Sequence, residues 1–97
     1  MTAYLIVNYD VDDADQYAEY QGGAAPALKI GDESQVLVLD HDSELLEGDP
    51  GAQTVVLEFE SKEKALETYR SGAYQKVVGT RLGATSKHFA VVVDKFG

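Results

Sequence analysis

Cysteine is absent from this 97-residue sequence, which also contains only two prolines, two histidines and one methionine. Without thiols the chain has no disulfide, no thiol nucleophile and no cysteine-ligated zinc site. No apolar run is long enough to cross a bilayer, and no basic segment followed by an apolar stretch suggests a secretory signal. These absences predict a cytoplasmic protein that does not insert into membranes.

Basic residues are scarce as well. Eight lysines and arginines stand against 17 aspartates and glutamates, which gives a net charge of −9. A field of this sign repels nucleic-acid phosphates and anionic lipid headgroups, so neither nucleic acid nor a membrane surface is expected as a partner. Hydrophobic residues make up 44% of the chain. At this length that composition suits one domain, residues 1–97, with a single core.

Four segments have the β-branched and aromatic composition that is typical of strands. They are residues 3–9, 35–40, 54–60 and 87–94. The loop at 41–53 contains Gly48, Pro50 and Gly51, which predicts that the second and third strands are antiparallel neighbours.

Apolar residues recur at helical spacing between these strands. One expected helix begins near residue 14, and two others cover residues 62–70 and 74–82. The pair Gly22-Gly23 is expected to weaken or break the first helix, because glycine is a poor helix former. Pro26 would then open a second short helical segment that ends at Gly31.

The resulting order is βαββαβ with an extra C-terminal helix before the last strand, which is the ferredoxin-like α+β arrangement. Such a sheet usually has one polar face, yet here both parities of the strands are apolar. If Leu5 and Leu57 face the helices, then Ile6, Val56 and Val92 would be exposed to solvent on the opposite face. Face-to-face packing of two sheets in a twofold homodimer would cover them and would form a dimeric α/β barrel.

Segments spread over the whole chain resemble one family. They are Tyr4–Asn8, Tyr17–Tyr20, Leu46–Gly48, Leu57–Phe59 with Ser61, and the stretch from Tyr69 through Ser71, Tyr74 and Gln75 to Arg81. This pattern is similar to the domain-of-unknown-function family thirteen-thirty, whose members are dimeric α/β barrels. The resemblance implies the fold and a homodimer but no reaction. Gly31-Asp32 departs from the pattern, since a glycine pair is common there.

Barrels related to this family include cofactor-free oxygenases, isomerases, haem-degrading enzymes and ligand-sensing modules, and fold alone does not choose among them. Strand parity predicts that Asn8, Glu58 and His88 point together into the barrel. In a partly apolar cavity these groups suit acid–base catalysis, with His88 or Glu58 as proton acceptor and Asn8 orienting it. That hypothesis describes a cofactor-independent isomerase, lyase or oxygenase acting on a small organic acid.

The competing hypothesis is a ligand-binding or purely structural dimer, in which His88 lies at the surface or the interface without a partner. Arg81 bears on both hypotheses, because it shares an apolar helix stripe with Tyr74 and burial would oblige it to find an acceptor. That acceptor would be a ligand carboxylate or, in a structural role, Glu47 or Glu58.

Ser71, Tyr74 and Glu47 join Arg81 as candidate substrate-binding residues because they match positions of the family. Ser71 also suits a helix N-cap, Tyr74 suits the core, and Glu47 suits an exposed loop charge. The four tyrosines of the expected helices could line an aromatic ligand pocket, although helix packing is the favoured interpretation. They are Tyr17, Tyr20, Tyr69 and Tyr74.

The run Asp40-His41-Asp42 invites a metal-site interpretation. Consecutive residues of an extended chain point to alternate sides, so His41 would oppose the two carboxylates. No pair of histidines has the spacing of metal ligands. We therefore expect neither a metal nor another cofactor.

Overall fold

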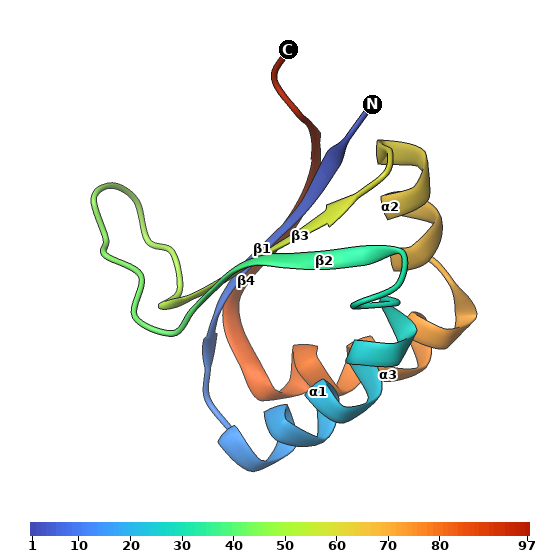
Figure 1. The fold of residues 1–97 in the computed structure, drawn as a ribbon. Helices are drawn as coiled ribbons and strands as arrows, with labels where there is room; N and C mark the ends of the chain where they lie inside the picture. The colour runs from blue at the N-terminus through green and yellow to red at the C-terminus, as the bar shows by residue number, and fades with distance from the viewer.

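The computed structural model describes residues 1–97 and contains four strands and three helices. In chain order these are β1 Ala3–Val11, α1 Ala14–Ala27, β2 Ser34–Asp40, β3 Gln53–Phe59, α2 Lys62–Tyr69, α3 Gly72–Ala84 and β4 Thr85–Asp94. The strands form one antiparallel sheet in the order β2-β3-β1-β4, and the helices cover one side of it (Figure 1). The predicted ferredoxin-like α+β arrangement is confirmed. No helix has the length and apolar character needed to cross a bilayer.

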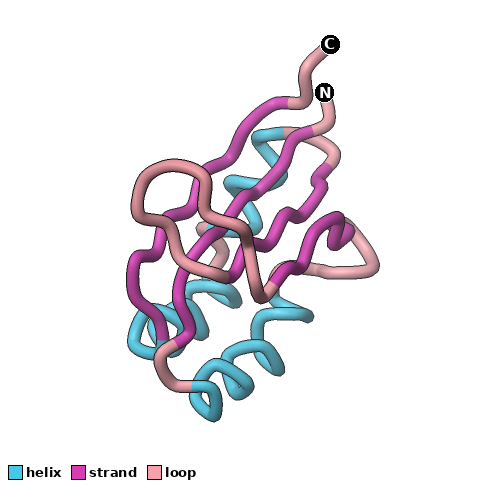
Figure 2. The backbone as a smooth tube through the Cα atoms, turned by 90° about the vertical axis from the view of Figure 1, so that its left-hand side faces the viewer, coloured by secondary structure: helices cyan, strands magenta, loops and turns pink.

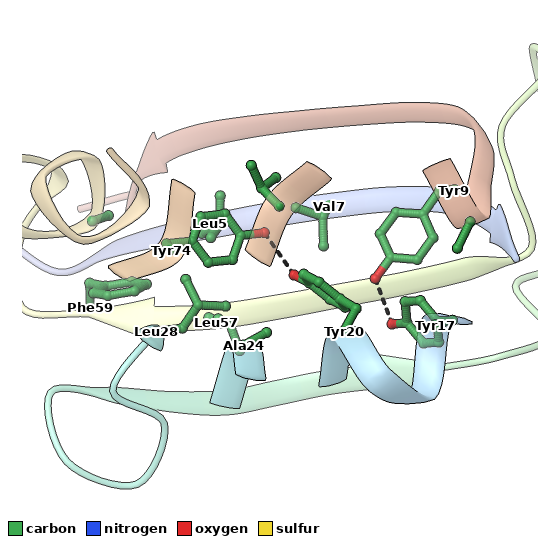
Figure 3. Close-up of a cluster of buried hydrophobic side chains, with 13 residues drawn as sticks. Leu5, Val7, Tyr9, Tyr17, Tyr20, Ala24, Leu28, Leu57, Phe59 and Tyr74 are labelled. Carbon is green, nitrogen blue, oxygen red and sulfur yellow. Dashed lines mark hydrogen bonds between the residues drawn. The ribbon is translucent and has the colours of Figure 1, made fainter. Parts of the chain in front are cut away.

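The core lies between the sheet and the helices. Successive strand residues point to opposite faces, and alternate residues of β1 and β3 are buried against α1 and α3 (Figure 3). The largest core side chains are Leu5, Val7, Tyr9, Tyr17, Tyr20, Leu28, Leu57, Phe59, Tyr74 and Val78. The prediction that Leu5 and Leu57 face the helices is therefore confirmed.

Helix α1 runs unbroken through Gly22-Gly23, so the predicted break is wrong. A Cβ atom on Gly23 would lie only 2.9 Å from Cγ1 of Val77 in α3. The missing side chain thus allows α1 and α3 to pack closely, and this contact outweighs the low helix propensity of glycine. Pro26 lies inside the last part of α1, and the chain leaves the helix through Lys29 and Gly31, which have φ angles of 57° and 86°.

The sheet face opposite the helices is apolar, and no helix covers it (Figure 1). Residues paired across antiparallel strands share a face, and Ile6 pairs with Val56 on β3 and with Val91 on β4. The prediction that Val92 belongs to this face is wrong, because Val92 packs against the core. Side chains on both sides of β4 are apolar, so the sequence does not show which of them face the helices. The pairing of β4 with β1 decides this. We call this surface the open face; its apolar members are Ile6, Val38, Val56, Phe89, Val91 and Val93.

The loop between β2 and β3, residues 41–52, projects away from the helices (Figures 1 and 2). Within one chain the sheet does not close on itself, since β2 and β4 are its two edges. The predicted dimeric barrel would therefore need a second subunit.

Candidate functional site

A cavity of about 150 Å³ lies between the helix-covered face of the sheet and α1. Fourteen of its 15 lining residues are hydrophobic. Three of them, Ile30, Val36 and Leu39, remain between 38% and 50% exposed. Every β2 residue after Ser34 is exposed, so no helix covers this edge of the sheet. The cavity therefore opens to solvent between α1 and β2.

A cluster of five tyrosines lies where the helices meet β1. Its members, called the tyrosine cluster below, are Tyr9 of β1, Tyr17 and Tyr20 of α1, Tyr69 of α2 and Tyr74 of α3. All except Tyr69 line the cavity. The hydroxyls form two pairs, Tyr9 with Tyr17 at 2.6 Å and Tyr20 with Tyr74 at 2.7 Å (Figure 3). These hydroxyls provide most of the polar atoms in an otherwise apolar wall.

Arg81 of α3 lies behind this wall and is only 1% exposed. Its guanidinium carbon is 5.2 Å from the centre of the Tyr9 ring and 6.0 Å from that of Tyr20. Nη2 donates to the Tyr69 hydroxyl at 3.3 Å, whereas Nε and Nη1 have no acceptor. Cation–π contacts of this kind recover about 2 kcal/mol when they are desolvated. They do not satisfy the two nitrogen atoms, whose burial without a partner costs free energy.

The predicted burial of Arg81 is confirmed, but Arg81 pairs with neither of the expected carboxylates. Glu47 is exposed in the loop between β2 and β3, and Glu58 belongs to the open face through its pairing with Tyr4. All ion pairs of the structure involve lysines. Arg81 is therefore a buried positive charge without a counterion.

Burial raises the pKa of Tyr9, Tyr20 and Tyr74 above the ordinary tyrosine value, and for Tyr9 and Tyr20 the paired tyrosine raises the pKa further. The positive charge of Arg81 opposes this shift without reversing it. The three phenols are consequently neutral near pH 7, and their hydroxyls can act as hydrogen-bond donors.

We expect these three tyrosines to ionise only as the protein unfolds. Their folded-state pKa values lie above the unfolded value of about 10, so the folded state retains protons that the unfolded chain releases. This contribution to stability is complete below about pH 10 and is lost as the pH rises further. Phenolate absorbance and circular dichroism measured together should show these ionisations coinciding with loss of structure. Their titration in a fully folded protein would contradict the assignment.

The predicted catalytic residues do not converge. Asn8 and Glu58 both belong to the open face, but Glu58 pairs with Tyr4, four residues from Asn8 along β1, or about 13 Å. His88 is exposed and adjoins Phe89, the residue that pairs with Asn8, at a point where the register of β1 and β4 shifts. His88 has no partner on β1 at this irregularity, so the strand pairing does not bring it together with Asn8 and Glu58.

Asn8 has a structural partner. Its Nδ2 donates to the Gly51 carbonyl oxygen at 3.0 Å, and the Gly51 N–H donates to Asn8 Oδ1 at 2.7 Å. A Cβ atom on Gly51 would lie 2.0 Å from the carbonyl carbon of Tyr9, so only glycine fits there. Asn8 thus attaches the end of the loop between β2 and β3 to β1.

The predicted substrate-binding residues divide into two groups. Tyr74 and Arg81 come together at the tyrosine cluster. Ser71 is the N-cap of α3, where its hydroxyl accepts from the Tyr74 N–H at 3.2 Å and donates to the Thr68 carbonyl at 2.7 Å. Ser71 and Glu47 are absent from the cavity wall.

Sequence reasoning missed two residues of the site, Tyr9 and Gln53. The parity that Tyr9 shares with Leu5 and Val7 could have placed it toward the helices. Gln53 gave no such signal, because it follows a glycine-containing loop, yet it is 4% exposed and hydrogen-bonded to Tyr17. Its Oε1 also lies 2.7 Å from Nδ1 of His41, the residue at the centre of the run that invited a metal-site interpretation.

Several solved structures share this fold. A protein of unknown function from Rhodopseudomonas palustris is 15% identical, with a TM-score of 0.76 over 99% of this chain and 83% of that one. A dabb family protein with a ferredoxin-like fold from Mesorhizobium loti is 12% identical, with a TM-score of 0.68 over 99% and 98% of the two chains. A dimeric ferredoxin-like protein of unknown function from Thermobifida fusca is 14% identical, with a TM-score of 0.67 over 98% and 92%. At these identities the likeness shows the fold alone.

No curated protein matches the sequence. The family model described as domain of unknown function DUF1330 matches residues 2–95. This match covers nearly all of the chain and confirms the resemblance that the sequence motifs indicated. The protein is therefore a member of the DUF1330 family.

Proposed function

We propose that the protein is a homodimer in which each subunit binds a small, partly apolar organic acid in the cavity beside the tyrosine cluster. The observation that carries this proposal is Arg81, a buried guanidinium with two nitrogen atoms that lack acceptors. Folded proteins leave few buried polar groups without a partner. Arg81 itself does not line the cavity, so a bound anion would supply the missing counterion from the other side of the tyrosine rings.

The surroundings of Arg81 favour an anion because they are rich in donors. Each tyrosine pair uses one hydroxyl proton for its internal hydrogen bond and retains a second one. No carboxylate lines the cavity. A carboxylate ligand could accept a charge-assisted hydrogen bond from the Tyr20–Tyr74 pair. The tyrosine rings would then separate it from the Arg81 charge.

The size of the cavity limits the apolar part of the ligand. A volume of about 150 Å³ holds roughly one benzene-sized ring or an aliphatic chain of similar bulk. Leu5, Leu28 and Leu57 belong to the wall that would contact such a group. The mouth between α1 and β2 gives the ligand a path from solvent.

A cofactor-independent enzyme of the isomerase, lyase or oxygenase type is the second candidate. The observation in its favour is that neutral tyrosine hydroxyls next to a buried cation can stabilise a developing oxyanion. What the cavity lacks is a proton acceptor, since His88, Glu58 and Asn8 lie outside it. Non-catalytic binding is therefore the function that the geometry supports better.

The homodimer is supported by the open face. Phe89, Val91 and Val93 are 47%, 44% and 37% exposed and stand side by side with Ile6 and Val56 across the sheet. Contiguous apolar surfaces of this kind commonly mark an interface. The dimeric protein from Thermobifida fusca, which shares the fold, agrees with this proposal. The cytoplasmic location expected from the sequence remains a prediction.

A thermal-shift comparison of matched ligands tests the proposal. Benzoate and hexanoate are expected to raise the melting temperature, whereas benzamide and hexanamide, which have the same apolar parts without the charge, should not. At a hundredfold excess over Kd a ligand adds about 2.7 kcal/mol to the free energy of unfolding. Equal shifts by acids and amides, or no shift by any acid of this size, would overturn the proposal.

A further inference from the structure

A chain of hydrogen bonds connects an exposed histidine to the inside of the cavity. Nδ1 of His41 lies 2.7 Å from Oε1 of Gln53, and Nε2 of Gln53 donates to the Tyr17 hydroxyl. The Tyr17 hydroxyl in turn lies 2.6 Å from that of Tyr9. Gln53, Tyr17 and Tyr9 are buried, so His41 is the end of the chain that meets solvent.

The fold brings these residues together from four parts of the chain. His41 directly follows β2, Gln53 is the first residue of β3, and Tyr17 lies in α1. Tyr9 of β1 pairs with Gln53 in the sheet, so both side chains point toward the helices. The far end of the chain is the Tyr9 ring, which stacks against the Arg81 guanidinium at 5.2 Å.

The direction of the hydrogen bonds in this chain depends on whether Nδ1 of His41 carries a proton. A protonated imidazole can only donate, which directs Oε1 of Gln53 to His41 and its amide hydrogens to Tyr17. Tyr17 then donates to Tyr9, and the Tyr9 proton is free for the cavity. In the neutral imidazole that carries its proton on Nε2, Nδ1 accepts, so the Gln53 amide can turn over and Tyr17 can donate to its oxygen. Tyr9 then donates to Tyr17 and offers the cavity no proton.

We propose that His41 and Gln53 are positioning residues that decide whether the Tyr9 hydroxyl offers its proton to the cavity. Protonation of His41 consequently strengthens binding of an anionic ligand. The effect on the ligand rests on the proposed function, whereas the reversal of the hydrogen bonds is a property of the free protein.

Other charged groups surround His41. Asp10 and Asp12 line the same surface depression, Asp40 and Asp42 flank His41 in the sequence, and Lys87 of β4 lies 3.8 Å from Asp10. Carboxylates and lysines ordinarily keep one charge between about pH 5 and pH 8, whereas histidine changes its charge there. The only other imidazole of the chain is that of His88 in β4, which provides the control.

The experiment follows the labelled Cζ carbons of tyrosine by NMR in the free protein between about pH 5 and pH 8. The Tyr9 and Tyr17 signals are expected to shift with the same midpoint as the His41 imidazole. His41→Gln should remove this shift, and Gln53→Leu should remove it while the His41 imidazole still titrates. His88→Gln is the matched control and should change neither. Tyr9 and Tyr17 signals that stay constant while His41 titrates would overturn the proposal.

Calorimetric titration with benzoate then measures the effect on binding. The wild type should bind at least about fivefold more tightly near pH 5.5 than near pH 8, the lower end of typical coupling between sites, and His41→Gln should bind equally at both values. Equal affinities of the wild type for benzoate at the two pH values would overturn the proposed effect of His41 on ligand binding. If benzoate binds at neither pH, the proposed function and that effect fail together, while the tyrosine signals still decide whether the hydrogen bonds reverse.

Discussion

Replacing Arg81 by methionine is expected to abolish binding of organic acids and to leave the free protein at least as stable as the wild type. Methionine fills most of the space of the arginine stem and removes a buried charge that has no counterion. The variant loses one hydrogen bond to Tyr69 and the cation–π contacts. Because apolar replacements of buried ionic groups often stabilise a protein by about 1 to 4 kcal/mol, we expect a net gain of roughly 1 kcal/mol.

Denaturant melts and acid-binding titrations of the same samples check this expectation. Arg70 is the other arginine of the chain and is exposed, so Arg70→Met is the matched control and should change stability by less than about 0.5 kcal/mol. Arg81→Lys keeps the charge without the planar donor fork and should bind acids with intermediate affinity. A loss of more than about 3 kcal/mol in ligand-free Arg81→Met would show instead that Arg81 holds the fold together.

Val91→Glu is expected to convert the proposed homodimer into folded monomers. Val91 stands next to Ile6 on the open face, and a carboxylate buried there without a partner is strongly unfavourable. A twofold axis places two such carboxylates in each interface. Weakening of association by about 4 kcal/mol raises the dimer dissociation constant roughly a thousandfold.

Light scattering at micromolar concentration measures the change. Leu82→Glu in α3 is the matched control, because Leu82 is 43% exposed, close to the 44% of Val91, but lies outside the sheet. The cavity is on the opposite side of the sheet, so the Val91→Glu monomer should still bind organic acids. A monomeric wild type, or a Val91→Glu protein that remains dimeric, would contradict the proposed interface.

Local patterns were sufficient for the elements of this protein. Short β-branched segments form the four strands, and Ser61 and Ser71 cap α2 and α3 by accepting hydrogen bonds from the backbone N–H three residues later. Helical spacing also predicted correctly that Arg81 is buried. Each of these features depends on residues within one or two turns of the chain, which a single sequence displays directly.

The site depended on contacts between distant parts of the chain. Arg81 has no carboxylate partner because Glu47 and Glu58 lie on other surfaces, and nothing near Arg81 in the sequence shows this. The glycine pair in α1 was misinterpreted for a similar reason, since its explanation is Val77 of α3. A buried arginine ordinarily pairs with a carboxylate, and glycine ordinarily weakens a helix. In this protein the packing of distant segments overrode both preferences.

The sequence by itself therefore determined the fold class, the family, the burial of Arg81 and the presence of an apolar face that helices do not cover. Only the tertiary structure decided which side chains share a site. Val92 could not be assigned to a face from the sequence because apolar residues occupy both alternations of β4, and its pairing with Leu5 of β1 decided it. The hydrogen bonds from Asn8 to Gly51 and from Gln53 to Tyr17 join residues 43 and 36 positions apart. Such pairings follow from how strands and helices meet in space, which periodicity within one element does not encode.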